Sequence, residues 1–302
     1  MQKITFKGWE NCYKLSSNFV ELIVTTDIGP RIIHFSFPGD ENVFAEFPDQ
    51  IGKSGGDDWR IYGGHRLWAA PEAQPRTYHP DNKPVKIVDF GNFVRLTAPV
   101  ETKTGIQKEM DISLSPNNTR VKVIHRISNH NLWTIELAPW ALSVMAPGGT
   151  AVLPLPSGGA HEANLLPSAN IVIWAYTKLN DPRWTWGNEY ILLCQDPSAK
   201  SPQKVGTNNM HGWAGYVRNG RFFLKTFAIH DRKQPYPDNG SSTELFTDPH
   251  FLEVETLGPL VKLQPGEEVE LVEKWYLFPE VKTPSNDQDV NEHILPKVKN
   301  IL

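Results

Sequence analysis

The stretch that decides the fold is Phe251–Tyr276, FLEVETLGPLVKLQPGEEVELVEKWY. We interpret it as a β-hairpin, in which FLEVET is one strand and VELVEKWYLF is the second. The connection between them contains Pro265-Gly266 and a short extended piece. Side chains on a strand alternate between its two faces. One face of the first strand can therefore pack on a core, and the other carries Glu253 and Glu255 together with Phe251. The core-facing residues are Leu252, Val254 and Thr256.

Glu253 and Glu255 are the first candidates for chemistry. Two residues apart on one strand, their Cα atoms lie roughly 6–7 Å from each other. Neighbouring like charges raise the pKa of each carboxyl group, and burial raises it further. This arrangement can produce a carboxylate base, but it is equally found on a wet sheet face with ordinary solvated acids.

The composition narrows the class of protein. The chain has 302 residues, of which 39% are hydrophobic and 21% charged, as in a globular protein. The net charge is −4 and no basic stripe is present, which argues against a nucleic-acid partner. No apolar run has membrane-spanning length and the N-terminus has no apolar leader, so we expect a cytoplasmic protein. The oligomeric state is open.

The pattern along the chain predicts an all-β protein. Short apolar runs alternate with turn residues, among them many of the 25 Pro and 22 Gly, and no helical periodicity persists. We therefore predict one large sandwich of two antiparallel sheets over residues 1–302, with at most a short helix and a tail after residue 278. The 10 Trp are a high number, and Trp can stack on the apolar face of a sugar ring.

Residues 49–83 read as a long irregular loop, which is often functional. Its glycine pair, Gly63-Gly64, permits a sharp turn or a close backbone approach. His65 could donate a proton, and Arg66 could clamp a hydroxyl or an anion. Trp68 adds an aromatic surface. The alternative is a structural loop whose polar side chains bond to the backbone.

Other candidate binding residues are scattered along the chain. Residues 147–190 contain a second irregular stretch, APGGTAVLPLPSGGAHEANLLPSAN, which holds His161, and residues 205–250 supply a polar and aromatic set. By contrast, we interpret His125 as structural and Asp181–Arg183 as a turn with a local ion pair. Together with Trp140, which shares a strand face with Glu136, the scattered candidates are His211, Trp213, Lys225, Tyr236 and Asp238.

Motifs for cofactors and metals are missing from the sequence. Dinucleotide, phosphate-loop, zinc-protease and serine-hydrolase signatures are absent, and Cys12 and Cys194 stand alone. We therefore expect no cofactor and no metal. The remaining classes of function are acid–base chemistry by Glu and His, and binding without chemistry.

Several segments resemble the galactose mutarotase-like (aldose 1-epimerase) superfamily. They are Asp27–Ile32, Gly63–Trp68, and above all FLEVETLGPL followed by LQPGE and VEKWYL. The match is nearer to a poorly characterised branch with GGHRLW, ELAPW and DPRW segments. The resemblance implies a β-supersandwich fold and a sugar or sugar derivative as the partner.

The resemblance also implies roles for some residues. In true mutarotases a late-strand glutamate takes the proton of the anomeric hydroxyl, while a histidine protonates the ring oxygen. This implies Glu255 as the base, with Glu253 as the alternate, and Arg66 as the counterpart of a pocket arginine. The family's mid-chain histidine has no match, because LAPWALSV with Trp140 stands there. In its place we consider His65 first, then His161 or His211.

Three functions follow as hypotheses. The first is an aldose 1-epimerase-like isomerase that interconverts sugar anomers with a Glu base and a His acid. The second is a catalytically inactive carbohydrate-binding protein. The third, a polysaccharide lyase or hydrolase, is weakened because the composition shows no helical companion domain. The sequence leaves open whether the protein is an enzyme and which sugar it would take.

Overall fold

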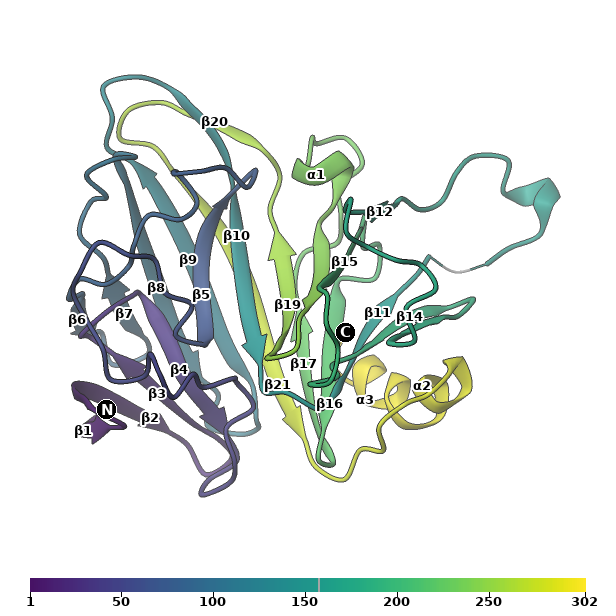
Figure 1. Ribbon diagram of the computed structural model, residues 1–302, viewed down its shortest axis with the longest axis horizontal. Coiled ribbons are helices and arrows are strands. Elements are labelled where there is room, and N and C mark those ends of the chain that lie inside the picture. Colours follow the sequence, from purple (N-terminus) through teal and green to yellow (C-terminus); the bar gives the residue numbers. More distant parts are fainter. Residues whose placement is uncertain (157) are drawn as a thin grey trace.

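Two antiparallel β-sheets pack face to face in a computed structural model that describes residues 1–156 and 158–302 (Figure 1). In this part of the chain one sheet has 11 strands and the other has 10. The large hydrophobic core lies between them and draws side chains from both, including Phe35, Phe44, Phe223 and Trp275. The predicted all-β sandwich is confirmed.

The larger sheet carries most of the features described below. In spatial order its strands are β1 (Gln2–Phe6), β2 (Trp9–Ser16), β3 (Glu21–Thr25), β4 (Arg31–Ser36), β5 (Gly64–Ala70), β10 (Ile135–Met145), β19 (Leu252–Leu257), β18 (Thr243–Thr247), β15 (Gln203–Thr207) and β12 (Ile171–Ile173), with β20 (Val261–Leu263) paired to β10.

The second sheet packs against the larger one. Its order is β13 (Trp184–Trp186), β14 (Tyr190–Cys194), β11 (Thr150–Pro154), β16 (Trp213–Arg218), β17 (Arg221–Thr226), β21 (Glu268–Phe278), β9 (Val121–Asn129), β8 (Ile106–Leu114), β7 (Val94–Thr97) and β6 (Lys86–Asp89).

Helices are short. The turn-like η1 (His161–Ala163) and α1 (Pro237–Gly240) lie in connections. As predicted, helix is found near the C-terminus, where α2 (Asp287–His293) and α3 (Leu295–Lys299) pack on the outer face of the second sheet through Val290, Ile294 and Val298. No helix in the described residues is both long enough and apolar enough to cross a membrane.

The predicted hairpin of Phe251–Tyr276 is wrong. Its two strands form, but β19 pairs with β10 and β18, whereas β21 pairs with β17 and β9 in the other sheet. The connection crosses from sheet to sheet and contributes β20 on the way. Alternation of apolar residues defines a strand and its buried face, but it does not identify the neighbouring strand.

The loop predicted over residues 49–83 is also wrong in its middle, since GHRLWAA is the buried strand β5. The glycine pair explains both the error and the structure. Gly63 and Gly64 have φ of 88° and 72°, and added Cβ atoms would lie 2.0 Å from the Ala45 carbonyl oxygen and 2.3 Å from that of Ile32. The pair thus permits a close backbone approach where the strand begins. Strand β11 similarly lies inside the second stretch predicted to be irregular.

Candidate functional site

The charged residues of the site lie in rows across five neighbouring strands of the larger sheet. In one row Arg66 of β5 lies opposite Leu142 of β10, which lies opposite Glu255 of β19, itself opposite Glu244 of β18. In the next row Glu253 lies opposite Phe246, which lies opposite Lys204 of β15. Strand alternation turns these side chains away from the second sheet, as predicted for Glu253 and Glu255.

These rows form the floor of a cavity of about 370 Å³. Its walls are rich in aromatic side chains, which come from the three strands β5, β10 and β18 and from the segments before and after β5, after β12 and before β19. Arg66, Glu72, Lys204 and Glu253 supply the charged groups of the lining. The aromatic residues are Trp59, Trp68, Tyr78, Trp140, Trp174, Tyr176, Phe246 and Phe251.

Each of the two cations in the lining is held by a carboxylate and by two tryptophan rings. The Arg66 Nη2 atom lies 2.9 Å from Glu253 Oε1, and the guanidinium lies 4.4 Å from the ring centre of Trp68 and 5.7 Å from that of Trp59. Such cation–π contacts fix the guanidinium plane while leaving its other N–H groups free to donate.

Lys204 repeats this arrangement on the other side of the cavity. Its Nζ lies 2.7 Å from Glu244 Oε2 and 3.1 Å from Glu255 Oε2. It also lies 4.7 Å from the ring centres of both Trp140 and Trp174. Burial lowers the pKa of Lys204, but Glu255 and Glu244 outweigh burial and raise it well above its ordinary value.

The carboxyl groups of the site have unequal access to the cavity. Glu255 is fully buried and accepts hydrogen bonds from Trp140 Nε1, at 2.8 Å, and from Lys204. Glu253 lines the cavity directly. Burial raises the pKa of Glu253 to about 7, against the opposing effect of Arg66, and burial also raises the pKa of Glu244. Of the two predicted carboxyl groups, Glu253, the alternate in the sequence-based assignment, is therefore the one that a ligand can reach.

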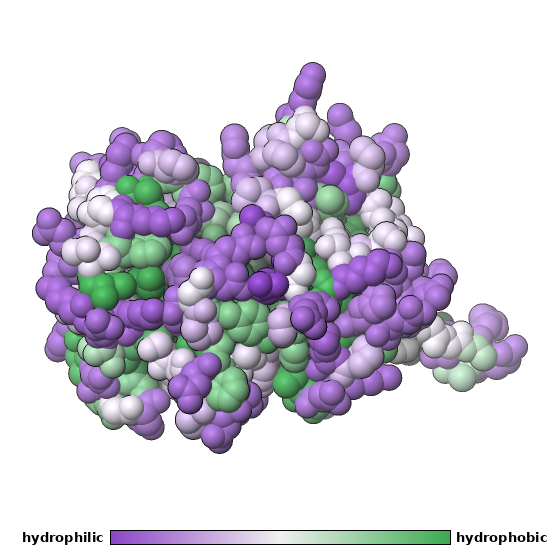
Figure 2. Space-filling view, turned by 90° about the horizontal axis from the view of Figure 1, so that it is seen from below, coloured by the Kyte–Doolittle hydropathy of each residue, from purple (hydrophilic) through white to green (hydrophobic). Residues whose placement is uncertain are grey.

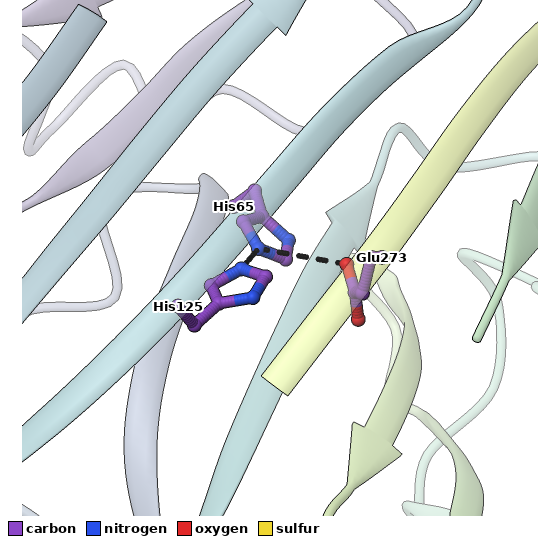
Figure 3. Close-up of side chains that lie close together, drawn as sticks. All are labelled: His65, His125 and Glu273. Carbon is purple, nitrogen blue, oxygen red and sulfur yellow. Dashed lines mark hydrogen bonds and ion pairs between the residues drawn. The ribbon is translucent and has the colours of Figure 1, made fainter. Parts of the chain in front are cut away.

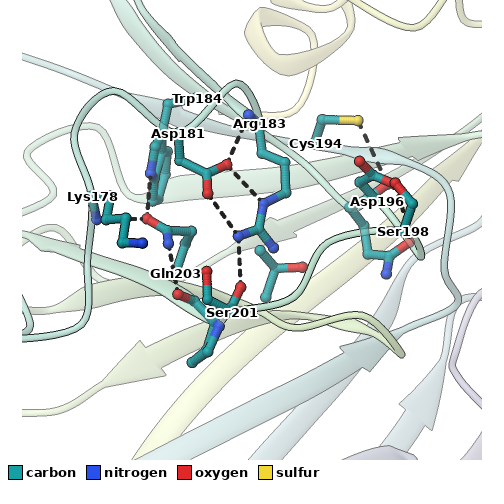
Figure 4. Close-up of polar contacts among 12 residues, drawn as sticks. Lys178, Asp181, Arg183, Trp184, Cys194, Asp196, Ser198, Ser201 and Gln203 are labelled. Atoms are coloured by element: carbon teal, nitrogen blue, oxygen red, sulfur yellow. Dashed lines mark hydrogen bonds and ion pairs between the residues drawn. The ribbon is translucent and has the colours of Figure 1, made fainter.

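A network of hydrogen bonds fixes the cavity wall that carries Trp174 and Tyr176 (Figure 4). The Thr177 hydroxyl donates to the Lys204 carbonyl oxygen at 2.6 Å. Arg183 forms a two-pronged ion pair with Asp181, at 2.9 and 3.0 Å, and donates to the Ser201 carbonyl oxygen at 2.6 Å. The ion pair predicted for this turn is confirmed, and its effect is to hold the wall against β15.

His65 does not line the cavity. It follows Gly64 on β5 and precedes Arg66, so alternation turns it to the opposite face, between the two sheets (Figure 3). There its Nε2 lies 2.7 Å from His125 Nε2 and 3.8 Å from Glu273 Oε2, while its Nδ1 lies 2.9 Å from the Ser143 hydroxyl. The structure thus separates His65 from Glu255 by the thickness of the sheet, and an acid–base pair of these two residues across one cleft is not formed.

The hydrogen-bond partners of this inner cluster determine its proton positions. His125 Nδ1 lies 2.9 Å from the Leu271 carbonyl oxygen, which can only accept. In the neutral ring His125 Nε2 must therefore accept from His65 Nε2, and His65 Nδ1 must accept from Ser143. Burial lowers the pKa of both histidines, which favours these neutral forms.

His65, His125 and Glu273 are also the set of described residues whose geometry could hold a metal ion, since their ligand atoms lie within 4.8 Å of one another. Both Glu273 oxygens already have partners. Lys225 Nζ lies 3.0 Å from one oxygen, and Trp275 Nε1 donates to the other at 2.8 Å. Glu273 Oε1 has this ion pair but no hydrogen bond, and Oε2 has a hydrogen bond, so groups of the protein contact both oxygens.

The remaining predicted site residues lie away from the cavity. Lys225 belongs to the inner cluster, and His161 is exposed on η1, which projects from the body at the right of Figures 1 and 2. His211 and Trp213 line a different cavity beside α3. Sequence spacing could not show that strand pairing sends these residues to different faces and sheets.

Tyr236 and Asp238 lie at α1, beyond the ends of β18 and β19. Tyr236 stacks on His230 with ring centres 4.2 Å apart. Asp238 does not line the cavity, but its charge contributes to the raised pKa of Glu244. The predicted residues that the structure does bring together are Arg66, Trp68, Trp140, Glu253 and Glu255.

Sequence reasoning missed several residues of the site. Lys204 and Glu244 lie in short strands and carry no motif, and their only signal is a charge within an alternating apolar pattern. Trp174 and Tyr176 follow an edge strand and were visible only as part of the high aromatic content. Tyr78 lies among polar residues that continue the segment after β5.

Comparison with known proteins identifies the fold. No family model matches the chain, and no curated protein matches it in sequence. Solved structures do match. A galactose mutarotase-like protein from Lactobacillus casei has a TM-score of 0.53 at 11% identity, covering 89% of this chain and 100% of its own. A Klebsiella pneumoniae protein, provisionally assigned as an aldose 1-epimerase, has a TM-score of 0.57 at 13% identity, with coverage of 96% and 83%.

A third similar structure is a TPR-domain containing protein from Parabacteroides distasonis. It has a TM-score of 0.58 at 15% identity, and the match covers 90% of this chain but only 48% of that protein. At these identities the comparisons establish the fold. This chain has the galactose mutarotase-like β-sandwich fold, as the resemblance in its sequence implied.

Proposed function

We propose that the aromatic cavity binds a carbohydrate. The observation that carries this proposal is the lining itself, in which four tryptophans and two tyrosines surround the Arg66–Glu253 pair within about 370 Å³. Aromatic faces pack on the C–H groups of a sugar ring, and a neighbouring donor and acceptor can bond to its hydroxyls. The volume is of the size usual for small-ligand sites.

The pair Arg66–Glu253 suits a hydroxyl group in particular. The Nε and Nη1 atoms of Arg66 are buried without a hydrogen-bond partner among the described residues. A buried donor without a partner is costly, so a bound acceptor would stabilise the site. A sugar hydroxyl can accept from Arg66 and donate to Glu253 at the same time.

The second part of the proposal concerns turnover. Glu253, with a pKa of about 7, can exchange a proton near neutral pH, as a 1-epimerase base must. In that role it would take the proton of the anomeric hydroxyl, and the ring oxygen would be protonated as the ring opens and recloses. The ammonium and hydroxyl groups in the lining that could supply that proton belong to Lys204, Tyr78 and Tyr176. The described lining includes no histidine, which favours the alternative of binding without turnover.

Binding is tested by titrating freshly dissolved aldoses into the protein while following tryptophan fluorescence. We expect saturable quenching, and at least about tenfold weaker binding in Trp174→Ala, because that ring forms one wall of the cavity. Trp133→Ala is the matched control, since Trp133 is 63% exposed and does not line the cavity. Absence of binding by every sugar in a broad panel would contradict the proposal.

Turnover is tested separately, by polarimetry and exchange NMR on those sugars that bind. If Glu253 is a base, Glu253→Gln should reduce the rate of anomer exchange by about 10²- to 10⁴-fold, while Glu136→Gln, on the same sheet but outside the cavity lining, should not. Binding without acceleration over buffer would leave a carbohydrate-binding protein and exclude the epimerase.

A further inference from the structure

The charges around the cavity are unbalanced, and this bears on which sugars fit. Arg66 and Lys204 are its two cations, and both are already paired, Arg66 with Glu253 and Lys204 with Glu244 and Glu255. A fourth carboxylate, Glu72, lines the cavity and has no ion pair among the residues the structure describes. The site therefore has four carboxyl groups for two cations.

Glu72 is the member of this set that faces solvent. It is exposed, and its carboxylate accepts a hydrogen bond from the hydroxyl of Tyr78, whose ring packs against Trp59 and Trp68. Any ligand that rests on these three rings comes close to an unpaired negative charge. The aromatic faces strengthen the preference, because they attract cations and repel anions.

An anionic ligand would have to compete with the carboxylates that already pair with the two cations. A ligand carboxylate or phosphate on Arg66 would have to displace Glu253 or lie beside it, and like charges at that distance repel. Lys204 Nζ lies 4.7 Å from the ring centres of Trp140 and Trp174 and has two carboxyl groups around it. At pH 7.5, above the pKa of about 7 of Glu253, that carboxyl group is mostly ionised, so protonation of Glu244, whose pKa is raised by burial, still leaves three carboxylates against two cations.

We propose that the cavity selects sugars by charge, in the order amino sugar, then neutral sugar, then acidic sugar, and that Glu72 is the residue that sets this order. The proposal rests on the proposed carbohydrate binding and extends it to a substrate class. The hydroxyl groups of the ring would meet Arg66 and Glu253, and an amino group would lie toward Glu72 and the rings of Trp59, Trp68 and Tyr78.

The test uses sugars that share one ring and differ in charge. Glucosamine, glucose and glucuronate, together with the corresponding galactose series, are titrated into the wild-type protein at pH 7.5 and low salt by calorimetry. We expect the acidic sugar of each series to bind about 2- to 5-fold more weakly than the neutral one, the effect of one exposed charge pair. Salt at 0.5 M should narrow the gap, because it screens exposed charges.

Glu72→Gln should remove most of the discrimination without abolishing binding of the neutral sugar, whereas Glu136→Gln, an exposed acid at the far end of β10, should leave the order unchanged. Equal or tighter binding of the acidic sugars by the wild type, or an unchanged order in Glu72→Gln, would overturn the charge selection and leave carbohydrate binding intact. Failure of all six sugars to bind would count against the proposed function itself, and the charge selection would fall with it.

Discussion

The two faces of β5, β10 and β19 carry charged clusters that differ in how completely their polar atoms are paired. On the inner face, His65, His125, Glu273 and Lys225 are paired with one another and with Ser143, Trp275 and backbone carbonyls. The one buried atom of these four side chains without a hydrogen bond, Glu273 Oε1, lies 3.0 Å from the Lys225 ammonium group. On the outer face, Arg66 retains unpartnered N–H groups, and Glu253 and Glu244 have raised pKa values. A cluster whose charged groups are paired within the protein stabilises the contact between the two sheets. A cluster with unpaired N–H groups beside a cavity can instead form hydrogen bonds with a ligand.

The largest effect should come from removing the cation of the inner cluster. Lys225→Met leaves Glu273 buried without its charge partner, and we expect it to lower the free energy of unfolding at pH 7 by about 3–5 kcal/mol. Urea unfolding followed by tryptophan fluorescence measures the loss. The double variant Lys225→Met/Glu273→Gln should recover part of it. A loss below about 1 kcal/mol would show that the inner cluster is not the tightly coupled unit described here.

Acid should affect the inner cluster next. The pKa of His65 and of His125 is lowered in the folded protein by burial, so the unfolded chain binds more protons as the pH falls through the ordinary value near 6.5. Stability is then lost on the acid side, and between pH 7 and 5 we expect the pair to cost about 3 kcal/mol. Urea unfolding at several pH values measures the slope. The same slope in His125→Gln would contradict the assignment, and His130→Gln, outside the cluster, should leave it unchanged.

The outer cluster should respond to pH in the opposite direction. The pKa of Glu253 is raised to about 7 by burial, so the folded protein holds a proton that the unfolded chain loses near pH 4.5. Stability therefore falls as the pH rises from about 4.5 through 7. Glu253→Gln removes this cost, and we expect it to be about 2 kcal/mol more stable than the wild type at pH 8, relative to the difference at pH 4. Parallel melting temperatures of the two proteins across this range would refute the raised pKa.

The smallest effect should follow the loss of a single donor in the outer cluster. Trp140→Phe keeps the ring packing but removes the hydrogen bond from Nε1 to Glu255, and we expect a loss of about 1 kcal/mol. Urea unfolding again provides the measurement. A loss above about 3 kcal/mol would show that the outer cluster is as tightly coupled as the inner one, and the contrast between the two faces would fail.

The fold and part of the site could be predicted because they depend on local pattern. Alternation in FLEVET correctly assigned Glu253 and Glu255 to the face away from the core, and the dense polar loop led to Arg66 and Trp68. Strand partners could not be predicted, since pairing is set by the whole sandwich. For this reason the sequence predicts β21 in the wrong sheet, and it predicts His65 beside Arg66 although consecutive residues of a strand face opposite ways.

Lys204 shows a further limit of the sequence. It lies about 50 residues before Glu255, in a five-residue strand without a motif, and becomes part of the site only because β18 separates β15 from β19. The inner cluster has the same origin, since His65, His125 and Glu273 come from three distant strands of two sheets. A site whose residues come from strands far apart in the sequence is therefore almost invisible in the spacing of residues along the chain.

The wall that carries Trp174 and Tyr176 has a mechanical consequence. It leaves the larger sheet at β12, which pairs with β15, and enters the second sheet at β13, which pairs with β14. The segment between β12 and β13 thus connects the two sheets at the open edge of the sandwich, and it covers the cavity. A ligand bound between this segment and the larger sheet would oppose separation of the two sheets at that edge. Amide hydrogen exchange in Ile171–Ile173 and in Trp184–Trp186 should therefore slow together when a ligand fills the cavity.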